Sequence, residues 1–239
     1  MLNKNSEIVK PFRYVFIAIA SASISISAAA SPPDPGSRAD ERYEDTVLSY
    51  LRPALHMAKK VGRLYYVVPC KDPDQDFPVP FPDVRTQAPL NHRSGLEAVR
   101  EIFRDDKQVT VLEEPNGIIR VSARQVPMAI LQTKIPLLRL SPLQQYNPIS
   151  AIFALTESKA IQTAMGKLNL REAASAFIIP HNLPAKTAPH LPAVIKDVTL
   201  DQALDTVAKT FEVIVIFGEC TSPTGEGFIR LKTVDLKDY

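Results

Sequence analysis

The clearest pattern in the chain is a run of hydrophobic and polar positions that occurs twice. The first copy begins at Ser94 with SGLEAVREIF, the second begins at Thr199 with TLDQALDTVA, and the two align at a constant offset of 105 residues. In each copy apolar residues recur at i, i+1 and i+4, which is typical of one face of a short amphipathic helix. The matched apolar residues are Ala98 and Ala203, Val99 and Leu204, and Ile102 and Val207.

Each predicted helix begins with the same capping signal. Ser94 and Thr199 suit the N-cap position, and Glu97 and Gln202 follow three residues later. In a capping box of this kind, the two side chains satisfy backbone donors that the first helical turn leaves without partners. Both copies are therefore predicted to start a helix at the same point of the pattern.

A pair of strands is predicted after each helix. Apolar residues alternate with the period of a half-buried strand from Val109 and again from Ile214. The first pair reverses at a turn ending in Gly117, and the second at 218–227, which carries five extra residues. The returning strands read GIIRV and GFIRL.

Two helix-strand-strand units are either an internal repeat or a coincidence of a common pattern, and we interpret them as a repeat. A two-stranded ribbon is too small to stand alone, so each unit needs a third strand. The candidates are Arg63–Pro69 for the first unit and Val194–Val198 for the second. The predicted fold class is α+β, with two small helix-plus-three-stranded-sheet modules joined by helical and proline-rich connections.

The rest of the chain sets the predicted domain boundaries. Helical spacing is present within 41–61 and again from Asn147 to Leu168, whereas six prolines between Pro69 and Leu90 predict an extended connection. The predicted organisation is a signal peptide (1–30), a flexible leader (31–40), a first α+β module (41–135), a helical connection (136–175) and a second α+β module (176–239). A short helix is also predicted over 126–135.

The first thirty residues predict export. Three basic residues precede an uncharged run from Tyr14 to Ala30, and the small residues at 28–30 suit signal cleavage before Ser31. A membrane-spanning helix is the alternative interpretation. The run has only seventeen residues, with four serines among them, whereas a bilayer requires about twenty apolar residues. We therefore expect a periplasmic or secreted protein with no stable membrane span after cleavage.

Charge argues against a nucleic-acid partner. The chain carries 28 Lys and Arg against 26 Asp and Glu, and removal of residues 1–30 leaves 25 of each. A nucleic-acid-binding protein needs a clustered basic face, for which this balance gives no support.

Export also affects the interpretation of the two cysteines. Cys70 and Cys220 are the only ones in the chain, and thiols in an oxidising compartment tend to pair. A disulfide between them would close a loop of about 150 residues and contribute about 4 to 5 kcal/mol in the chain-entropy model. The alternative is two buried free thiols.

The block from Val198 to Val234, with VTLDQALDTVAKTF, VIVIF and GFIRLKTV, resembles the secretin and TonB short N-terminal domain. Members of that family carry a glycine between the helix and the strand, where this chain has Phe211-Glu212. The resemblance implies a small periplasmic α+β module that docks other envelope proteins through sheet edges or helix faces. An unpaired sheet edge can accept a strand from a partner. The predicted edge residues are Val213, Val215, Phe217, Phe228 and Arg230.

Catalytic chemistry has no recognisable sequence signal. The chain contains no GxSxG, HExxH, GxGxxG or phosphate-binding loop, so we predict no catalytic, cofactor-binding or metal-ligating residue. His181 and His190 lie nine residues apart in a proline-rich segment and are interpreted as loop residues rather than a metal pair. Of Tyr65 and Tyr66, adjacent on a strand, one is expected in the core and the other on the surface.

The sequence thus predicts an exported accessory or interaction module, not an enzyme, which docks envelope proteins of a secretion, pilus or receptor system. The alternatives are a periplasmic small-ligand-binding protein with a pocket between the modules, or an enzyme whose site is assembled from dispersed residues. The sequence does not specify the oligomeric state.

Overall fold

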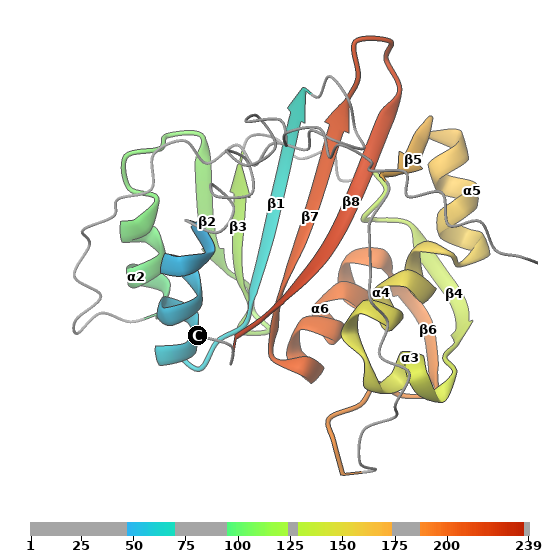
Figure 1. Cartoon of the computed structure of the whole chain (residues 1–239), viewed down its shortest axis with the longest axis horizontal. Helices are drawn as coiled ribbons and strands as arrows, with labels where there is room; N and C mark the ends of the chain where they lie inside the picture. The colour runs from blue at the N-terminus through green and yellow to red at the C-terminus, as the bar shows by residue number, and fades with distance from the viewer. Residues whose placement is uncertain (1–46, 70–94, 124–128, 174–186, 237–239) are drawn as a thin grey trace, which may run out of the picture. The chain divides into compact units, whose positions relative to one another are not determined.

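A computed structural model describes residues 47–69, 95–123, 129–173 and 187–236 (Figure 1). All of these residues belong to one compact unit. The predictions for the signal peptide, the leader, Cys70, Ser94 and His181 lie outside the described residues.

The described residues form a mixed sheet of six strands, a separate sheet of two strands, and helices, which confirms the α+β class. The large sheet has the order β2-β3-β1-β7-β8-β5, and the small sheet pairs β4 with β6. The strands are β1 (Gly62–Pro69), β2 (Val109–Glu113), β3 (Ile119–Ala123), β4 (Lys134–Arg139), β5 (Leu170–Glu172), β6 (Val194–Thr199), β7 (Val213–Thr221) and β8 (Gly227–Asp235). The helices are a first one over 47–57, α2 (Gly95–Ile102), α3 (Pro142–Tyr146), α4 (Pro148–Thr156), α5 (Lys159–Lys167) and α6 (Leu200–Phe211).

Two hydrophobic cores lie on opposite faces of the large sheet. Successive side chains of a strand point to opposite faces, and β1 shows this directly. Leu64 and Tyr66 pack in a core with the first helix and α2, whereas Tyr65 packs in a second core with α4, α5, α6 and the β4–β6 sheet. Figure 1 shows these two groups of elements on either side of the sheet.

Both predicted helix-strand-strand units are present. α2 leads into the antiparallel pair β2–β3, and α6 leads into the antiparallel pair β7–β8. At the start of α6, the Thr199 side chain accepts a hydrogen bond from the Gln202 amide, and the Gln202 side chain accepts one from the Thr199 amide, so this capping box is confirmed. The first hairpin turns at Gly117, whose φ of 82° is left-handed.

The prediction of two separate three-stranded sheets is wrong. β1 does join the first unit as predicted, by pairing with β3, but its other edge pairs with β7, so strands of both predicted modules join in one sheet. The predicted third strand of the second unit is β6, which pairs with β4 instead. The two units also place α2 and α6 on opposite faces of the sheet, so the repeat in element order does not become a repeated three-dimensional module.

The region between the units is more varied than the predicted helical connection. α4 and α5 confirm its helices, and the Asn147 side chain caps α4 by accepting from the Ser150 amide. However, β4 and β5 lie at its two ends. The short helix predicted over 126–135 is wrong in its described part, where a turn leads into β4. Pro136 lies inside that strand, and proline counts against a strand in sequence reasoning.

The prediction for the two tyrosines is also wrong. Tyr65 and Tyr66 do point to opposite faces, but they are 1% and 2% exposed. Both are buried because β1 is an internal strand with packed layers on each side.

Candidate functional site

The most elaborate polar arrangement in the described residues surrounds Arg63 of β1. Its side chain is 0% exposed and lies beneath the first turns of α6. The guanidinium donates to the Asp201 backbone oxygen at 3.0 Å, to Asp201 Oδ1 at 3.2 Å and to Asp205 Oδ1. Tyr65 adds a phenol that donates to Asp201 Oδ1 at 2.8 Å. The two carboxylates lie one helical turn apart, so one face of α6 presents both.

A second arginine completes this ionic cluster from β3. Arg120 donates to Asp201 Oδ2 at 3.0 Å, and its Nε lies 3.3 Å from Glu114 Oε1. Asn116 donates to Asp205 Oδ2 at 2.9 Å from the turn between β2 and β3. The ionic cluster, defined as Arg63, Tyr65, Glu114, Asn116, Arg120, Asp201 and Asp205, therefore joins α6 to the first predicted unit.

The electrostatics of the ionic cluster fit a structural role, in which paired charges attach α6 to the sheet. Burial raises the pKa of Tyr65 far above its ordinary value, so the phenol keeps its proton and serves as a donor. Both guanidinium groups also lie over its ring, at 4.7 and 4.8 Å from the ring centre. Asp201 is in the first turn of α6, where the helix dipole favours a negative charge. The ion pairs of the cluster link α6 to β1 and β3, while the buried Nε atoms of Arg63 and Arg120 have no hydrogen-bond partner.

Cavities are the next place where chemistry could be located. One of about 300 Å³ is lined by residues from both predicted units: His56, Lys59, Lys60, Val61, Glu212 and Leu236. Within it, Lys60 is already paired with Glu113 at 2.7 Å. Lys59 and Glu212 take left-handed backbone conformations, with φ of 52° and 55°, at the ends of the first helix and α6.

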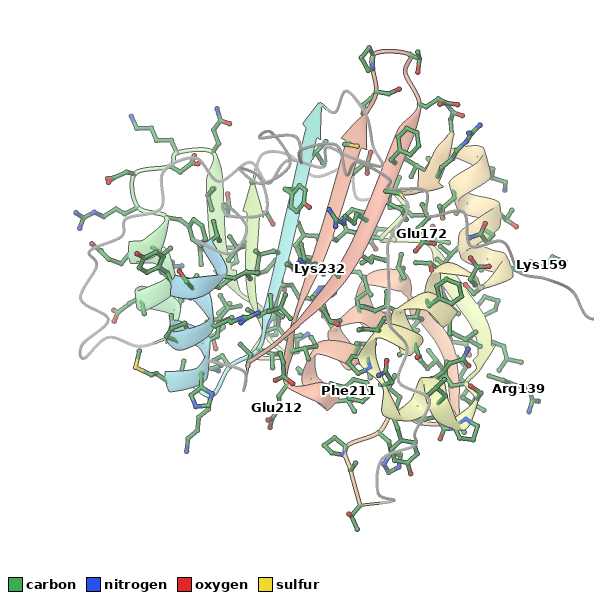
Figure 2. All side chains as sticks on the ribbon, viewed as in Figure 1. Arg139, Lys159, Glu172, Phe211, Glu212 and Lys232 are labelled. Carbon is green, nitrogen blue, oxygen red and sulfur yellow. The ribbon has the colours of Figure 1, made fainter. Side chains whose placement is uncertain are left out.

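A second cavity of about 440 Å³ lies beside α5 and β5 and is mostly polar. Burial raises the pKa of Glu172, the nearby charge of Glu157 raises it further, and a hydrogen bond from Thr156 opposes both. Figure 2 labels Glu172, the last residue of β5. Among the residues that the structure describes, no group of three or more His, Cys, Asp or Glu side chains is placed to hold a metal ion.

The two-stranded sheet, which we call the β4–β6 ribbon, has a different character. Ile135 and Leu138 of β4 and Ile195 of β6 face the second core. The opposite face carries Leu137 and Val194, which are 54% and 39% exposed. Of the residues that the structure describes, none forms a third strand beside either strand of the ribbon.

Charged side chains surround these two exposed residues. Lys134, Arg139 and Lys196 are all exposed, and Asp197 is the one acidic residue on the two strands. None of the ion pairs found among the described residues involves them. Figure 2 shows the Arg139 side chain projecting away from the ribbon. The β4–β6 ribbon thus combines exposed aliphatic side chains with an excess of positive charge.

The strand edge predicted from the sequence is wrong in its main part. Val213, Val215 and Phe217 pack in the second core and are at most 3% exposed, and β7 pairs with β8 along its length and with β1 from Val215 onward. Phe228 and Arg230 are on β8, which pairs with β7 on one side and with β5 at Gly227–Ile229 on the other. The continuous apolar run VIVIF was the available signal, since strands buried on both faces lack alternation.

Sequence reasoning also missed the ionic cluster and the ribbon. Arg63 stands alone among apolar residues of β1, and Asp201 and Asp205 are spaced for one helix face. Those two facts indicate a buried ion pair, but only the tertiary fold brings β1 and α6 together. Of the histidines considered, His190 stacks on Tyr146 with ring centres 4.9 Å apart.

The predicted disulfide stays a prediction. Cys220 is 0% exposed on β7, and its register partner across the parallel pair is Val68. Cys70 follows two positions after Val68 in the sequence but lies outside the described residues.

Comparison with known proteins gives no family for this chain: no family model, no curated protein and no solved structure matches it. No helix among the described residues is long and apolar enough to cross a membrane. Any functional conclusion therefore depends on the chain's own residues.

Proposed function

We propose that the protein is an exported accessory module of the cell envelope that docks another envelope protein, with the β4–β6 ribbon as its docking surface. The observation that carries the proposal is a two-stranded sheet with no outer partner among the described residues and with exposed Leu137 and Val194 on its outer face. Strand edges of this kind accept a strand from a partner. The signal-like first thirty residues support the envelope location.

The resemblance to the secretin and TonB short N-terminal domain adds support. The family's glycine between helix and strand corresponds to Phe211-Glu212 in this chain. Glu212 has a φ of 55°, which is the left-handed conformation that glycine adopts most readily. The local geometry is thus the one that a glycine at this point would provide, although the side chain differs.

Crosslinking in intact cells tests the docking proposal. A photo-reactive amino acid at Leu137 is expected to capture a discrete envelope protein, identified by mass spectrometry. The same amino acid at Leu112, a 50% exposed leucine on the edge strand β2, is the matched control. Capture of a secretin, pilus or receptor component from position 137 but not 112 would support the proposal. Equal capture from both positions, or none, would contradict it.

Export needs its own measurement. Intact-mass analysis of the protein recovered from cells is expected to show a chain that begins at Ser31, and the protein is expected in the periplasmic or extracellular fraction. A chain that retains residues 1–30 and stays in the cytoplasm would remove the envelope part of the proposal.

A small-ligand-binding function is the second candidate, because the 300 Å³ cavity is lined by residues from both predicted units. A ligand that binds the native state raises the melting temperature by mass action. Thermal-shift screening with small anions and amphiphiles, repeated on Lys59→Glu, would favour this function if a shift appeared only in the unmodified protein.

A further inference from the structure

The backbone of the β4–β6 ribbon determines which of its peptide groups face outward. The Leu140 amide donates to the Ala193 oxygen at 2.9 Å, so these two residues occupy a hydrogen-bonded position of the ribbon. In an antiparallel ladder such pairs alternate with pairs whose peptide groups point away. Counting back along β4, Leu138 points inward, whereas Leu137 and Arg139 point their N–H and C=O groups away from β6.

The alternation changes phase at Pro136. The Leu200 amide donates to the Thr133 oxygen at 2.9 Å, so counting from that end of β4 places Ile135 inward, as Leu138 is, and Pro136 is the one β4 residue without a register partner on β6. Asp197 takes a left-handed φ of 54°, and the strand pair is bent there, as the three-residue spacing of the core residues Ile135 and Leu138 also indicates. The outer edge used below is therefore the part of β4 after Pro136, at Leu137 and Arg139.

Side chains at the same edge select the chemistry of a partner. Lys134, Arg139 and Lys196 contribute three positive charges against the single negative charge of Asp197. Opposite charges placed across from one another stabilise strand pairs, and like charges destabilise them. Leu137 and Arg139 are two residues apart and share the outer face, so the acidic side chains of an added strand lie on that face, whereas its aliphatic side chains lie on the face of Leu138, which packs against the second core.

We infer that the β4 edge binds an extended segment of a partner protein in which acidic and aliphatic side chains alternate. This segment adds as a third strand to the β4–β6 ribbon, hydrogen-bonds to Leu137 and Arg139, and places its carboxylates against Lys134, Arg139 and Lys196. The inference rests on the proposed function, and it adds the chemical class of the partner to it.

The other terminal strand with an exposed leucine does not offer the same chemistry. On β2, Leu112 is flanked by Glu113, whose carboxylate is already paired with Lys60 at 2.7 Å. Arg120, opposite Leu112 on β3, is bound within the ionic cluster. An acidic strand therefore has a favourable charge environment at β4 and not at β2.

Synthetic peptides test the inference on the protein purified as cells process it. The probe is a ten-residue peptide of alternating Glu and Val, and the matched peptide carries Lys in place of Glu. Binding is followed by fluorescence anisotropy and by amide exchange at single residues. We expect saturable binding of the acidic peptide and slowed exchange at Leu137 and Arg139. The Lys peptide should bind at least about tenfold more weakly, which corresponds to about 1.4 kcal/mol.

Two variants complete the test. Arg139→Glu with Lys134→Glu is expected to weaken binding of the acidic peptide by at least about tenfold, and Lys107→Glu, at an exposed lysine before β2, is expected to leave it unchanged. Unchanged melting temperatures show that the variants fold. The inference is overturned if both peptides bind equally, if protection appears on β2, or if no saturable binding occurs below about 1 mM.

The two proposals can fail separately. If position 137 crosslinks an envelope protein in cells but the double charge reversal leaves that capture unchanged, the docking function holds and the acidic-strand inference fails. If the acidic peptide protects Leu137 and Arg139 but no protein is captured in cells, the edge chemistry holds and the docking function fails.

Discussion

The two helix-strand-strand units share one pattern of residues but differ in where the fold places them. β2 is the terminal strand of the large sheet, with one covered face, whereas β7 lies between β1 and β8 with cores on both faces. At matching positions 105 residues apart, Leu112 is 50% exposed and Phe217 is 0% exposed. The same local unit thus serves once as a border of the sheet and once as its centre.

The difference between an edge strand and a central strand is visible in the residues that face away from the apolar positions that the two units share. Val109 and Val111 match Ile214 and Ile216, and all four pack in the same core. Between them, Thr110 of the first unit corresponds to Val215 of the second. A strand with one covered face tolerates a threonine there, whereas a strand covered on both faces favours an apolar residue. Alternating apolar and polar residues therefore indicate the edge strand here, and a continuous apolar run indicates the central strand.

The largest expected effect concerns the attachment of α6, which α2 does not share. Arg63→Met removes the central cation of the ionic cluster and leaves the Asp201 and Asp205 carboxylates with Arg120 as the remaining cation of the cluster. We expect a loss of roughly 3 to 5 kcal/mol in the free energy of unfolding, which is the range for breaking a buried ion pair. Urea denaturation measures it. Arg100→Met is the control, because Arg100 is the counterpart of Asp205 on α2 and is exposed. An equal cost for both variants would contradict the comparison.

Substitution at the matched strand positions is expected to separate the two units nearly as strongly. Phe217→Ala creates a cavity in the second core and should cost roughly 3 to 5 kcal/mol. Leu112→Ala removes an exposed side chain and should change stability by no more than about 0.5 kcal/mol. Thermal and urea unfolding of both variants checks this. Similar costs would mean that β2 is covered on both faces as β7 is.

The helix caps give a smaller and more even comparison. Thr199→Ala removes the side-chain acceptor of the Gln202 amide and should cost about 1 kcal/mol, whereas Thr199→Ser should restore most of it. The sequence predicts the same role for Ser94, so Ser94→Ala should cost a similar amount. A negligible cost for Ser94→Ala, measured by urea denaturation, would show that α2 begins without this cap.

The smallest expected effect is a pH dependence at the matched pair Glu114 and Glu219. Burial raises the pKa of Glu219, so the native state holds its proton more tightly than the unfolded state does. This contribution to stability is present below the ordinary glutamate pKa and is lost as the pH rises through the raised value. Glu219→Gln should therefore raise the melting temperature near pH 7 and change it little near pH 4.

Glu114→Gln should act in the opposite direction near pH 7, because its carboxylate pairs with Arg120 at 3.3 Å. Melting curves across this pH range test both variants. A parallel response of the two would mean that the buried and the paired glutamate experience the same environment.

The sequence by itself determined the local units of this protein. The Thr199 capping box, the helical spacing of α2 and α6, and the pair of strands after each helix are set by interactions within a few residues, and these predictions are confirmed. The strand over 63–69 and the helices between Asn147 and Leu168 also followed from short-range periodicity. Such patterns depend on backbone geometry, which each segment carries with it.

Only the tertiary structure decided which strands pair. β1 pairs with β3 and β7 at once and so merges the two predicted modules, while β6 leaves the second unit and pairs with β4. Every strand offers the same backbone hydrogen-bonding groups. The sequence therefore predicts which side chains of a strand are buried more readily than it predicts which strands pair with it. The ionic cluster and the outer edge of β4 both follow from that pairing. Their side chains come from segments up to 142 residues apart, which only the assembled sheet brings into contact.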